Sequence, residues 1–308
     1  MKASRIRYLP NGEIDKAKWD GCVYRSPNGL LYATSLHLDH MAGNQWDGLV
    51  LGDYEAVMPL PWRKKYGILY LYQPAFTQQS GIFYMNAITP QLEAAFILEA
   101  KRHFAFAEIF LNHAHPAKTQ HPETIKTNYV LDLSLSYRDI RAKYHYDFAK
   151  NVKRADKNGL RLNAQALFNT AIAEYATLYG KLMPELTSAQ YRQFAQLCAA
   201  MDASGNLYCR ECLDENGERM SSILLLKYKN RYYNLVSNIT GKGKALKSNH
   251  FLYDAVIREL SGTGHILDLE GSDLPGVAHF YSILGAENQP YYFRKWNDLP
   301  YYLRWLKN

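Results

Sequence analysis

Apolar residues recur along this chain with two periods, and the period separates the predicted strands from the predicted helices. Short alternating or continuous apolar runs bounded by Gly, Pro, Asn and Asp predict strands. These runs are Trp46–Gly52, Tyr54–Leu60, Ile68–Tyr72, Ala107–Leu111, Thr127–Leu133, Leu207–Leu213, Ser221–Tyr228, Arg231–Ser237 and His265–Leu269. Apolar stripes with a spacing of three to four residues predict helices. These stripes lie in Ile14–Cys22, Leu36–Met41, Pro90–Phe104, the segment from Ser136 to Asn158, Phe168–Lys181, Ser188–Ala200 and the segment after Ser248 or Asn249.

The order of these elements is the same in both halves of the chain: helices, a strand meander, a helix and further strands. This recurrence predicts an α/β (α+β) fold of two domains, each with a mixed sheet flanked by helices. We place the domains at residues 1–130 and 131–294. We expect residues 295–308 to return to the first domain, because the aromatic tail of Tyr301, Tyr302 and Trp305 needs a surface to bury against.

A glycine- and lysine-rich stretch follows the third strand of the second meander. We interpret it as a basic loop, Gly241, Lys242, Gly243, Lys244 and Lys247, that leads into a helix capped by Ser248 or Asn249. Free backbone N–H groups at the start of a helix, with lysines around them, suit a phosphate-bearing ligand. A solvated surface turn is the alternative, since the stretch has neither P-loop nor GxGxxG spacing.

The charge balance favours anionic partners. The chain carries 36 basic and 29 acidic residues, a net charge of +7, and its pI is near 9.0. Much of the basic excess lies on one face of the helix that ends at Asn158-Gly159. That face is either solvated or contacts the phosphate backbone of an RNA such as tRNA. Its candidate contact residues are Arg141, Lys150, Lys153, Arg154 and Lys157.

The cysteines and histidines predict no metal site. Cys209 and Cys212 form a single CxxC in a strand-like run, and zinc sites need more ligands. The His37/His40 pair and the group of His113, His115 and His121 lack a regular framework of further ligands. No run of 18 apolar residues and no signal sequence occurs, so we expect a cytoplasmic protein whose four cysteines are free thiols.

Three stretches resemble the Fem-type peptidoglycan peptidyltransferases and their tandem-GNAT relatives. They are Thr127–Leu133, the basic helix ending in Val152-Lys-Arg-Ala-Asp-Lys-Asn-Gly159, and Asp268-Leu-Glu-Gly-Ser272 followed by Gly276-Val-Ala-His-Phe280 and Leu284-Gly-Ala286. The likeness covers most of the chain and is clearest from about residue 127 to residue 293. The resemblance implies two GNAT-like domains in tandem, each with a mostly antiparallel sheet, and a cleft between them. It also implies transfer of an amino acid from aminoacyl-tRNA, or of an acyl group from acyl-CoA.

The chain departs from that family at three places. Tyr281 follows Phe280 where Fem-type enzymes often have a lysine, and a phenol donates a hydrogen bond but supplies no cation. The segment 160–206 is too short and too apolar for the long helical hairpin that some members use for tRNA. The stretch from Gly241 to Lys247 lacks the Q/RxxGxG/A spacing that binds the diphosphate of CoA.

The leading hypothesis is therefore an acyltransferase that uses an amine acceptor, either a small molecule or a precursor peptide of the cell wall or a surface polymer. Glu270 is the candidate proton acceptor, and Tyr281 and Ser272 are the candidate partners of the donor carbonyl. Lys242, Gly243, Lys244, Lys247 and Asn249 are the candidate phosphate contacts. We expect no tightly bound cofactor, only acyl-CoA or aminoacyl-tRNA as co-substrate. The alternatives are a non-catalytic ligand-binding protein with the same fold and an RNA-binding protein.

Overall fold

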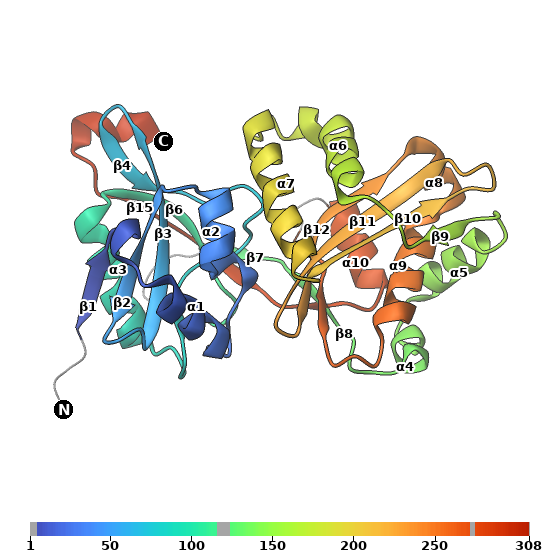
Figure 1. Ribbon diagram of the computed structural model, residues 1–308, viewed down its shortest axis with the longest axis horizontal. Coiled ribbons are helices and arrows are strands. Elements are labelled where there is room, and N and C mark those ends of the chain that lie inside the picture. The colour runs from blue at the N-terminus through green and yellow to red at the C-terminus, as the bar shows by residue number, and fades with distance from the viewer. Residues whose placement is uncertain (1–4, 116–123, 272–274, 308) are drawn as a thin grey trace. The chain divides into compact units, whose positions relative to one another are not determined.

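The computed structural model describes residues 5–115, 124–271 and 275–307, with side chains as far as residue 304. It divides the chain into two compact units (Figure 1). Unit 1 contains Met1–Lys126 and Pro290–Asn308, and unit 2 contains Thr127–Gln289. Both boundaries lie a few residues before the positions 130 and 294 that we placed from the sequence.

Unit 1 is built on an eight-stranded sheet. Its strands are β1 (Ile6–Leu9), β2 (Trp46–Leu51), β3 (Ala56–Lys65), β4 (Ile68–Leu71), β5 (Phe83–Tyr84), β6 (Phe106–Leu111), β7 (Thr124–Lys126) and β15 (Tyr291–Asn297). They lie in the order β1-β2-β3-β4-β6-β15-β7, and β5 pairs with β3 off this path. The C-terminal strand β15 thus inserts between β6 and β7 and completes the sheet.

Three helices accompany this sheet: α1 (Lys16–Arg25), α2 (Ser35–Met41) and α3 (Pro90–His103). Helix α3 packs on β1 and β2, whereas α1 packs on β3 and β5. All six residues of β2 are buried. A strand buried throughout its length is largely apolar on both faces. The exception in β2 is Asp47, which accepts hydrogen bonds from the Tyr8 hydroxyl and the Asn11 backbone N–H.

Unit 2 is built on a seven-stranded sheet. Its strands are β8 (Tyr129–Asp132), β9 (Arg161–Asn163), β10 (Leu207–Leu213), β11 (Arg219–Tyr228), β12 (Arg231–Ile239), β13 (Ile266–Asp268) and β14 (Glu287–Asn288). They lie in the order β14-β8-β13-β12-β11-β10-β9. The helices are α4 (Tyr137–Ala142), α5 (Tyr146–Ala155), α6 (Phe168–Tyr179), α7 (Ser188–Ala203), α8 (Gly241–Leu246), α9 (Ser248–Leu260) and α10 (Pro275–Ile283).

The central strand β11 of unit 2 has helices on both faces. Its residues Ile223 and Leu225 belong to one core cluster with residues of α5 and α9. The alternate residues Leu224 and Leu226 are fully buried as well, and both α6 and α7 also contact β11. Because successive side chains of a strand point to opposite faces, the strand is enclosed between two helical layers.

Each sheet is antiparallel except for one parallel pair whose strands are joined through helix. In unit 1, α3 lies between β4 and β6 along the chain, and these strands are parallel. In unit 2, α8 and α9 lie between β12 and β13, which are also parallel. The predicted fold class, two mixed sheets flanked by helices, is confirmed.

Several predicted elements need correction. The helix expected from Ser136 to Asn158 is broken into α4 and α5, because the His145 side chain caps a new helix by accepting a hydrogen bond from the Asp147 backbone N–H (3.2 Å). Its buried stripe is as predicted: Ile140, Tyr144, Phe148, Val152 and Ala155. The strand predicted to end at Leu60 continues as β3 to Lys65, and a two-residue turn joins it to β4.

The C-terminal end of the chain follows the sequence expectation only in part. Trp296 is buried in unit 1, and its indole N–H donates to the Phe104 carbonyl (2.8 Å). Tyr301 and Tyr302 are 84% and 59% exposed, however, so the expectation that these rings are buried is wrong. The strand β15 escaped prediction because its inward positions are Tyr292, Arg294 and Trp296, and a buried arginine breaks the apolar alternation.

Candidate functional site

The two parallel strands of unit 2 separate after a short paired stretch. β12 and β13 pair only from Arg231↔Ile266 to Tyr233↔Asp268, and β12 then continues to Ile239 paired with β11 but not with β13. At the point of separation, the register between β11 and β12 shifts, so that Leu235 has no partner on β11. A bulge at such a point re-aims the side chains that follow it. The candidate site lies along this diverging part of β12.

Two buried tyrosines lie against the diverging strand. The Asn234 amide donates to the Tyr253 hydroxyl (2.8 Å) and lies 3.5 Å from the Tyr281 hydroxyl. The Tyr253 hydroxyl donates to Ser237 Oγ (3.2 Å). Tyr253 comes from α9 and Tyr281 from α10. The site therefore joins one strand and two helices that are distant in sequence.

One polar atom of this cluster has no hydrogen-bond partner among the described residues. Asn234 is 5% exposed, and its Oδ1 is buried without a donor. A buried carbonyl oxygen left unpaired costs about 1–3 kcal/mol. Asn234 Oδ1 is therefore a free acceptor within the described part of this cluster.

Burial keeps both phenols protonated. Burial raises the pKa of Tyr281 well above its ordinary value, and the neighbouring Tyr253 and the charge of Glu270 raise it further. Burial also raises the pKa of Tyr253, although hydrogen bonds to Ser237, Tyr281 and Asn234 oppose the shift. At neutral pH these groups serve as hydrogen-bond donors, not as bases.

Glu270 lies two residues after the end of β13, and its charge contributes to the raised pKa of Tyr281. Its backbone has φ +63°, a left-handed conformation that is uncommon for a residue with a long side chain. The Glu270 backbone N–H donates to Asp268 Oδ1 (3.1 Å). Asp268 is fully buried and is paired with Arg231 (2.6 Å). A buried ion pair thus holds the turn that presents Glu270.

The charge of Glu270 raises the pKa of Tyr281, so these two predicted catalytic residues remain candidates for one site, whereas the third is not described. Ser272 lies outside the described residues. Sequence reasoning missed Asn234 and Tyr253. Asn234 interrupts an otherwise apolar strand, Tyr-Tyr-Asn-Leu-Val, and a polar residue at an inward position of a buried strand is the signal that could have identified it.

The predicted phosphate-binding loop is a helix. Gly241–Leu246 forms α8, and the Thr240 hydroxyl caps it by accepting from the Gly243 N–H (2.9 Å). A Cβ at Gly243 would lie 2.2 Å from the Met220 backbone oxygen, so this glycine permits close packing of α8 on β11. The Gly243 N–H is thus bonded to Thr240, and the stretch is not the open glycine-rich loop that the sequence predicted.

The lysines of this segment have different surroundings. Lys242 forms ion pairs with both Asp214 and Glu218 (2.6 Å each), and the hydrogen bond to Asp214 raises its pKa. Lys244 is exposed and Lys247 is half-buried at the left-handed joint between α8 and α9. Neither has an ion-pair partner in the part of the chain that the structure describes. Of the three predicted lysine contacts, Lys244 and Lys247 remain candidates.

The start of α9 carries a second unpaired acceptor. Asn249 Oδ1 is buried without a hydrogen-bond partner in the described ranges, and Asn249 was a predicted ligand contact. The neighbouring His250 lies 3.3 Å from Asn151 of α5, and burial, followed by the charge of Lys247, lowers its pKa to about 4. His250 is therefore neutral at pH 7 and does not add to the positive charge of this region.

The basic face of α5 is exposed as predicted. Lys150, Lys153, Arg154 and Lys157 are exposed, and none of them forms an ion pair with the described residues. Asn158, just beyond α5, donates to the Leu246 carbonyl at the end of α8 (3.0 Å), so the two segments end side by side. Arg141 belongs to α4 instead, where it lies over the Tyr137 ring.

The cysteines and histidines form no cluster of metal ligands among the described residues. All four cysteines are buried free thiols, and burial raises the pKa of Cys209 and of Cys212 to about 12. The ring of His37 is buried and contacts Thr77 Oγ1 (2.8 Å). His121 lies outside the described residues.

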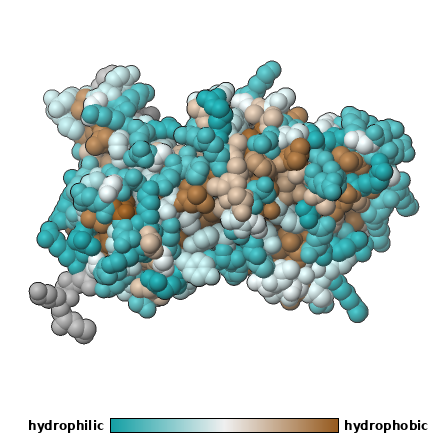
Figure 2. Space-filling view, viewed as in Figure 1, coloured by the Kyte–Doolittle hydropathy of each residue, from teal (hydrophilic) through white to brown (hydrophobic). Residues whose placement is uncertain are grey.

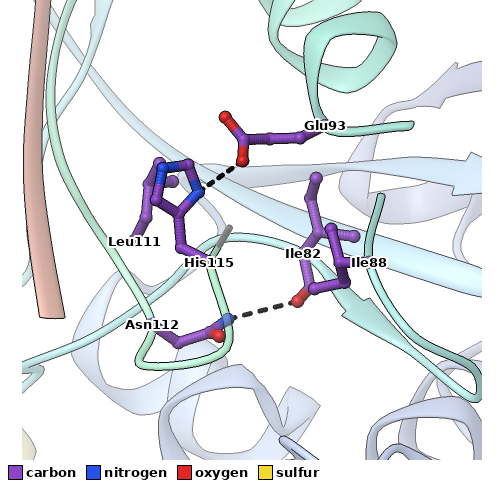
Figure 3. Close-up of a pocket in the computed structure, with 6 residues that line it drawn as sticks. All are labelled: Ile82, Ile88, Glu93, Leu111, Asn112 and His115. Carbon is purple, nitrogen blue, oxygen red and sulfur yellow. Dashed lines mark hydrogen bonds and ion pairs between the residues drawn. The ribbon is translucent and has the colours of Figure 1, made fainter. Parts of the chain in front are cut away.

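Unit 1 contains a buried ionic cluster that sequence reasoning missed. His115 Nδ1 lies 2.5 Å from Glu93 Oε2, and Arg294 lies 2.8 Å from the other oxygen of Glu93. Figure 3 shows Glu93 and His115 facing each other beside a cavity that Asn112 also lines. Its volume of about 10 Å³ suits about one water molecule. The cluster ties β15 to α3, and the signal for it was a carboxylate next to the apolar stripe of α3.

Comparison with known proteins shows which solved structures share this architecture. Neither a protein-family model nor a curated protein matches the sequence. Among solved structures, FemX superposes with a TM-score of 0.66 over 98% of this chain and 99% of its own, at 12% identity. A tandem GNAT protein from the clavulanic acid biosynthesis pathway gives 0.51 over 96% and 99%, also at 12% identity. The chain has the tandem GNAT fold.

A further tandem GNAT-like neighbour is the C-terminal domain of a putative lysylphosphatidylglycerol synthetase from Agrobacterium fabrum. Its TM-score is 0.56 at 12% identity, with 93% of this chain and 92% of that chain covered. At these identities the comparison establishes the fold, which agrees with the resemblance found in the sequence.

Proposed function

We propose that this tandem GNAT protein is an acyltransferase that transfers an aminoacyl or acyl group to an amine. The observation that carries the proposal is the buried Tyr253–Tyr281 pair beside Glu270, at the point where β12 and β13 separate. It is supported by the fold shared with FemX, with a lysylphosphatidylglycerol synthetase and with a protein described as a tandem GNAT protein.

In the proposed reaction, the amine nitrogen attacks the carbonyl carbon of the donor. The new C–N bond forms, the bond from the carbonyl carbon to the donor oxygen or sulfur breaks, and the leaving group takes up a proton. Glu270 accepts the proton that the amine loses. Tyr281, whose pKa is raised, remains a phenol and donates a hydrogen bond to the oxygen on which negative charge develops.

We favour a tRNA-linked donor over acyl-CoA. The helical conformation of 241–246 and the ion pairs of Lys242 remove the free loop that would bind the diphosphate of CoA. The unpaired cations of α5, together with Lys244 and Lys247, instead offer several separated charges, and such an arrangement suits a polyanionic backbone. The acceptor amine belongs to a small molecule or a precursor peptide.

The test is a transfer assay with two donors. Radiolabelled aminoacyl-tRNA and radiolabelled acetyl-CoA are each incubated with the protein and a lysine-containing peptide, and label in the peptide is measured. We expect transfer from aminoacyl-tRNA, and we expect K153A/K157A to raise the apparent KM for tRNA by about tenfold or more, as loss of two phosphate contacts does. The matched control is K18A/K101A, which removes the same charge from lysines already paired with Asp53 and Asp298.

Three other outcomes of the transfer assay would change or overturn the proposal. Transfer from acetyl-CoA alone would reject the tRNA donor but keep the acyltransferase. Equal losses in K153A/K157A and K18A/K101A would remove α5 from donor binding. Tight tRNA binding without transfer to any peptide or small amine would favour the RNA-binding alternative and overturn the proposal.

A further inference from the structure

One surface of unit 1 is exposed, basic and aromatic, and it takes no part in the site proposed above. We name it the hairpin surface. It consists of the tip of the β3–β4 hairpin and the first residues of the C-terminal helical turn, Tyr301–Lys307. Its exposed side chains are Lys64, Lys65, Tyr66, Leu69, Tyr301 and Tyr302.

The sheet topology places both parts at the same end of unit 1. β4 runs parallel to β6 with Leu71 opposite Ala107, so the hairpin tip extends beyond the first residue of β6. β15 runs antiparallel to β6 with Asn297 opposite Phe106, so the chain after Asn297 leaves at the same end. Figure 1 shows both segments at the top of unit 1, and Figure 2 shows brown and pale residues among teal ones there.

The turn of the hairpin exposes the large Tyr66 ring to solvent in a strained backbone conformation. Lys65 pairs with Ile68, and the two residues between them, Tyr66 and Gly67, have φ +52° and +81°. Such a two-residue turn favours Asn or Gly, and a bulky residue is strained in it. Tyr66 is nevertheless 75% exposed, and Lys65 Nζ lies 5.3 Å from its ring centroid. A strained backbone conformation at a residue whose ring contributes little to the core indicates a function for the Tyr66 ring.

The charge of this surface has one sign. Residues 61–71 include three basic residues and no acidic one, and residues 299–308 include two basic and no acidic residues. The acidic residues on the neighbouring strand ends are already paired, Glu108 with Lys295 (3.2 Å) and Asp298 with Lys101 (3.0 Å). The hairpin surface therefore presents uncompensated positive charge between aromatic rings.

We propose that the hairpin surface binds the surface of an anionic lipid bilayer. Lys64 and Lys65 are placed to attract anionic headgroups, and the tyrosine rings are of the kind that lies at headgroup level. Leu69, 40% exposed, enters the apolar boundary. RNA also binds cationic and aromatic side chains, but it has no apolar region that would take up an exposed aliphatic side chain such as Leu69. We therefore favour a lipid surface. No described helix is long and apolar enough to cross a bilayer, and binding at the surface needs none.

The test is co-sedimentation of the full-length protein with two kinds of vesicle, phosphatidylcholine alone and phosphatidylcholine mixed with phosphatidylglycerol. We expect binding to the mixed vesicles that weakens with added salt. K64A/K65A should reduce it by about 25-fold, since each lysine near an anionic surface contributes about fivefold. The matched control K153A/K157A removes the same charge from the end of α5 and the turn after it. Among the described residues of α5, Tyr146 is the one exposed ring, so this variant should keep binding within about twofold.

A second variant separates function from folding. Tyr66→Asn places a residue that the turn favours, so we expect a higher melting temperature together with weaker vesicle binding. Equal sedimentation with both kinds of vesicle, or unchanged binding in both hairpin variants, would overturn the proposal. Loss of tRNA binding in K64A/K65A without any vesicle binding would do the same and assign the surface to RNA. None of these readouts depends on transfer activity.

Discussion

At the scale of single residues, the candidate site depends on how Glu270 and Tyr281 are held. Glu270 sits at φ +63°, at a turn anchored by the buried Arg231–Asp268 pair, so its carboxylate is presented by a backbone that cannot relax freely. Tyr281 is 7% exposed and packs at an angle on Tyr129 and Tyr253. A carboxylate and a protonated phenol fixed in this way are pre-organised for proton transfer and hydrogen bonding.

Near-isosteric substitutions test these two roles. We expect Glu270→Gln and Tyr281→Phe each to lower the transfer rate by about 10²-fold or more, with donor affinity nearly unchanged. Tyr144→Phe is the control, because it removes a hydroxyl from another buried tyrosine of unit 2. Single-turnover rates and equilibrium donor binding measure the two effects separately. Full rates in both site variants would place the chemistry elsewhere in the protein.

His37 predicts a pH dependence of stability. Burial, followed by the charge of His40, lowers the pKa of His37 from 6.5 to about 3 in the folded protein. Between these values the unfolded chain binds one proton more than the folded chain, so stability present above pH 6.5 is lost as the pH falls. The contribution is about 1.4 kcal/mol per pH unit.

Urea denaturation between pH 7 and pH 4 measures this contribution. The His37→Gln variant should lose stability less steeply than the parent as the pH falls. His40→Gln, on the same helix and with its ring partly in solvent, should keep the steep loss of the parent. Parallel curves for the parent and His37→Gln would show that His37 is protonated equally in both states.

At the scale of elements, two glycines of α8 have opposite roles. A Cβ at Gly243 would meet the Met220 backbone oxygen at 2.2 Å, whereas a Cβ at Gly241 would have no atom within 4 Å. We expect Gly243→Ala to destabilise the protein by about 1–3 kcal/mol, because the helix must move away from β11. Gly241→Ala should stabilise it by up to about 1 kcal/mol through its higher helix propensity. Urea midpoints of the two variants test the packing, and equal effects would contradict it.

The same segment shows what the sequence could and could not predict. Local periodicity identified the buried stripe of α4 and α5 and most strands, because burial follows a fixed spacing in regular elements. The local sequence Gly-Lys-Gly-Lys predicts a loop. The helix observed there is explained only by tertiary contacts: Gly243 packs on β11, and Lys242 pairs with Asp214 and Glu218. Glu270 became a candidate through its place at a strand end and Tyr281 through the resemblance, whereas Asn234 and Tyr253 meet through a contact between elements that no local pattern contains.

At the scale of the whole molecule, the chain leaves unit 1 after Lys126 and returns at Pro290. The returning strand β15 supplies Arg294 to the buried Glu93 and packs Trp296 into the core. Without β15, Glu93 would lack its arginine partner, and breaking a buried pair costs about 3–5 kcal/mol. Unit 1 is therefore discontinuous in sequence, and its first segment is incomplete without the last.

This arrangement predicts that unit 2 can be removed. Tyr291 and Lys126 are opposite each other in the antiparallel pair of β15 and β7, so a short Asn-Gly turn can join residue 126 to residue 290. We expect the joined chain, residues 1–126 linked to 290–308, to unfold cooperatively in urea. Residues 1–126 alone should lack a cooperative transition, since they miss β15 and leave Glu93 without Arg294. Circular dichroism during denaturation distinguishes the two chains. A cooperative transition in residues 1–126 alone would show that β15 is dispensable, and its absence from both chains would show that unit 1 depends on unit 2 to fold.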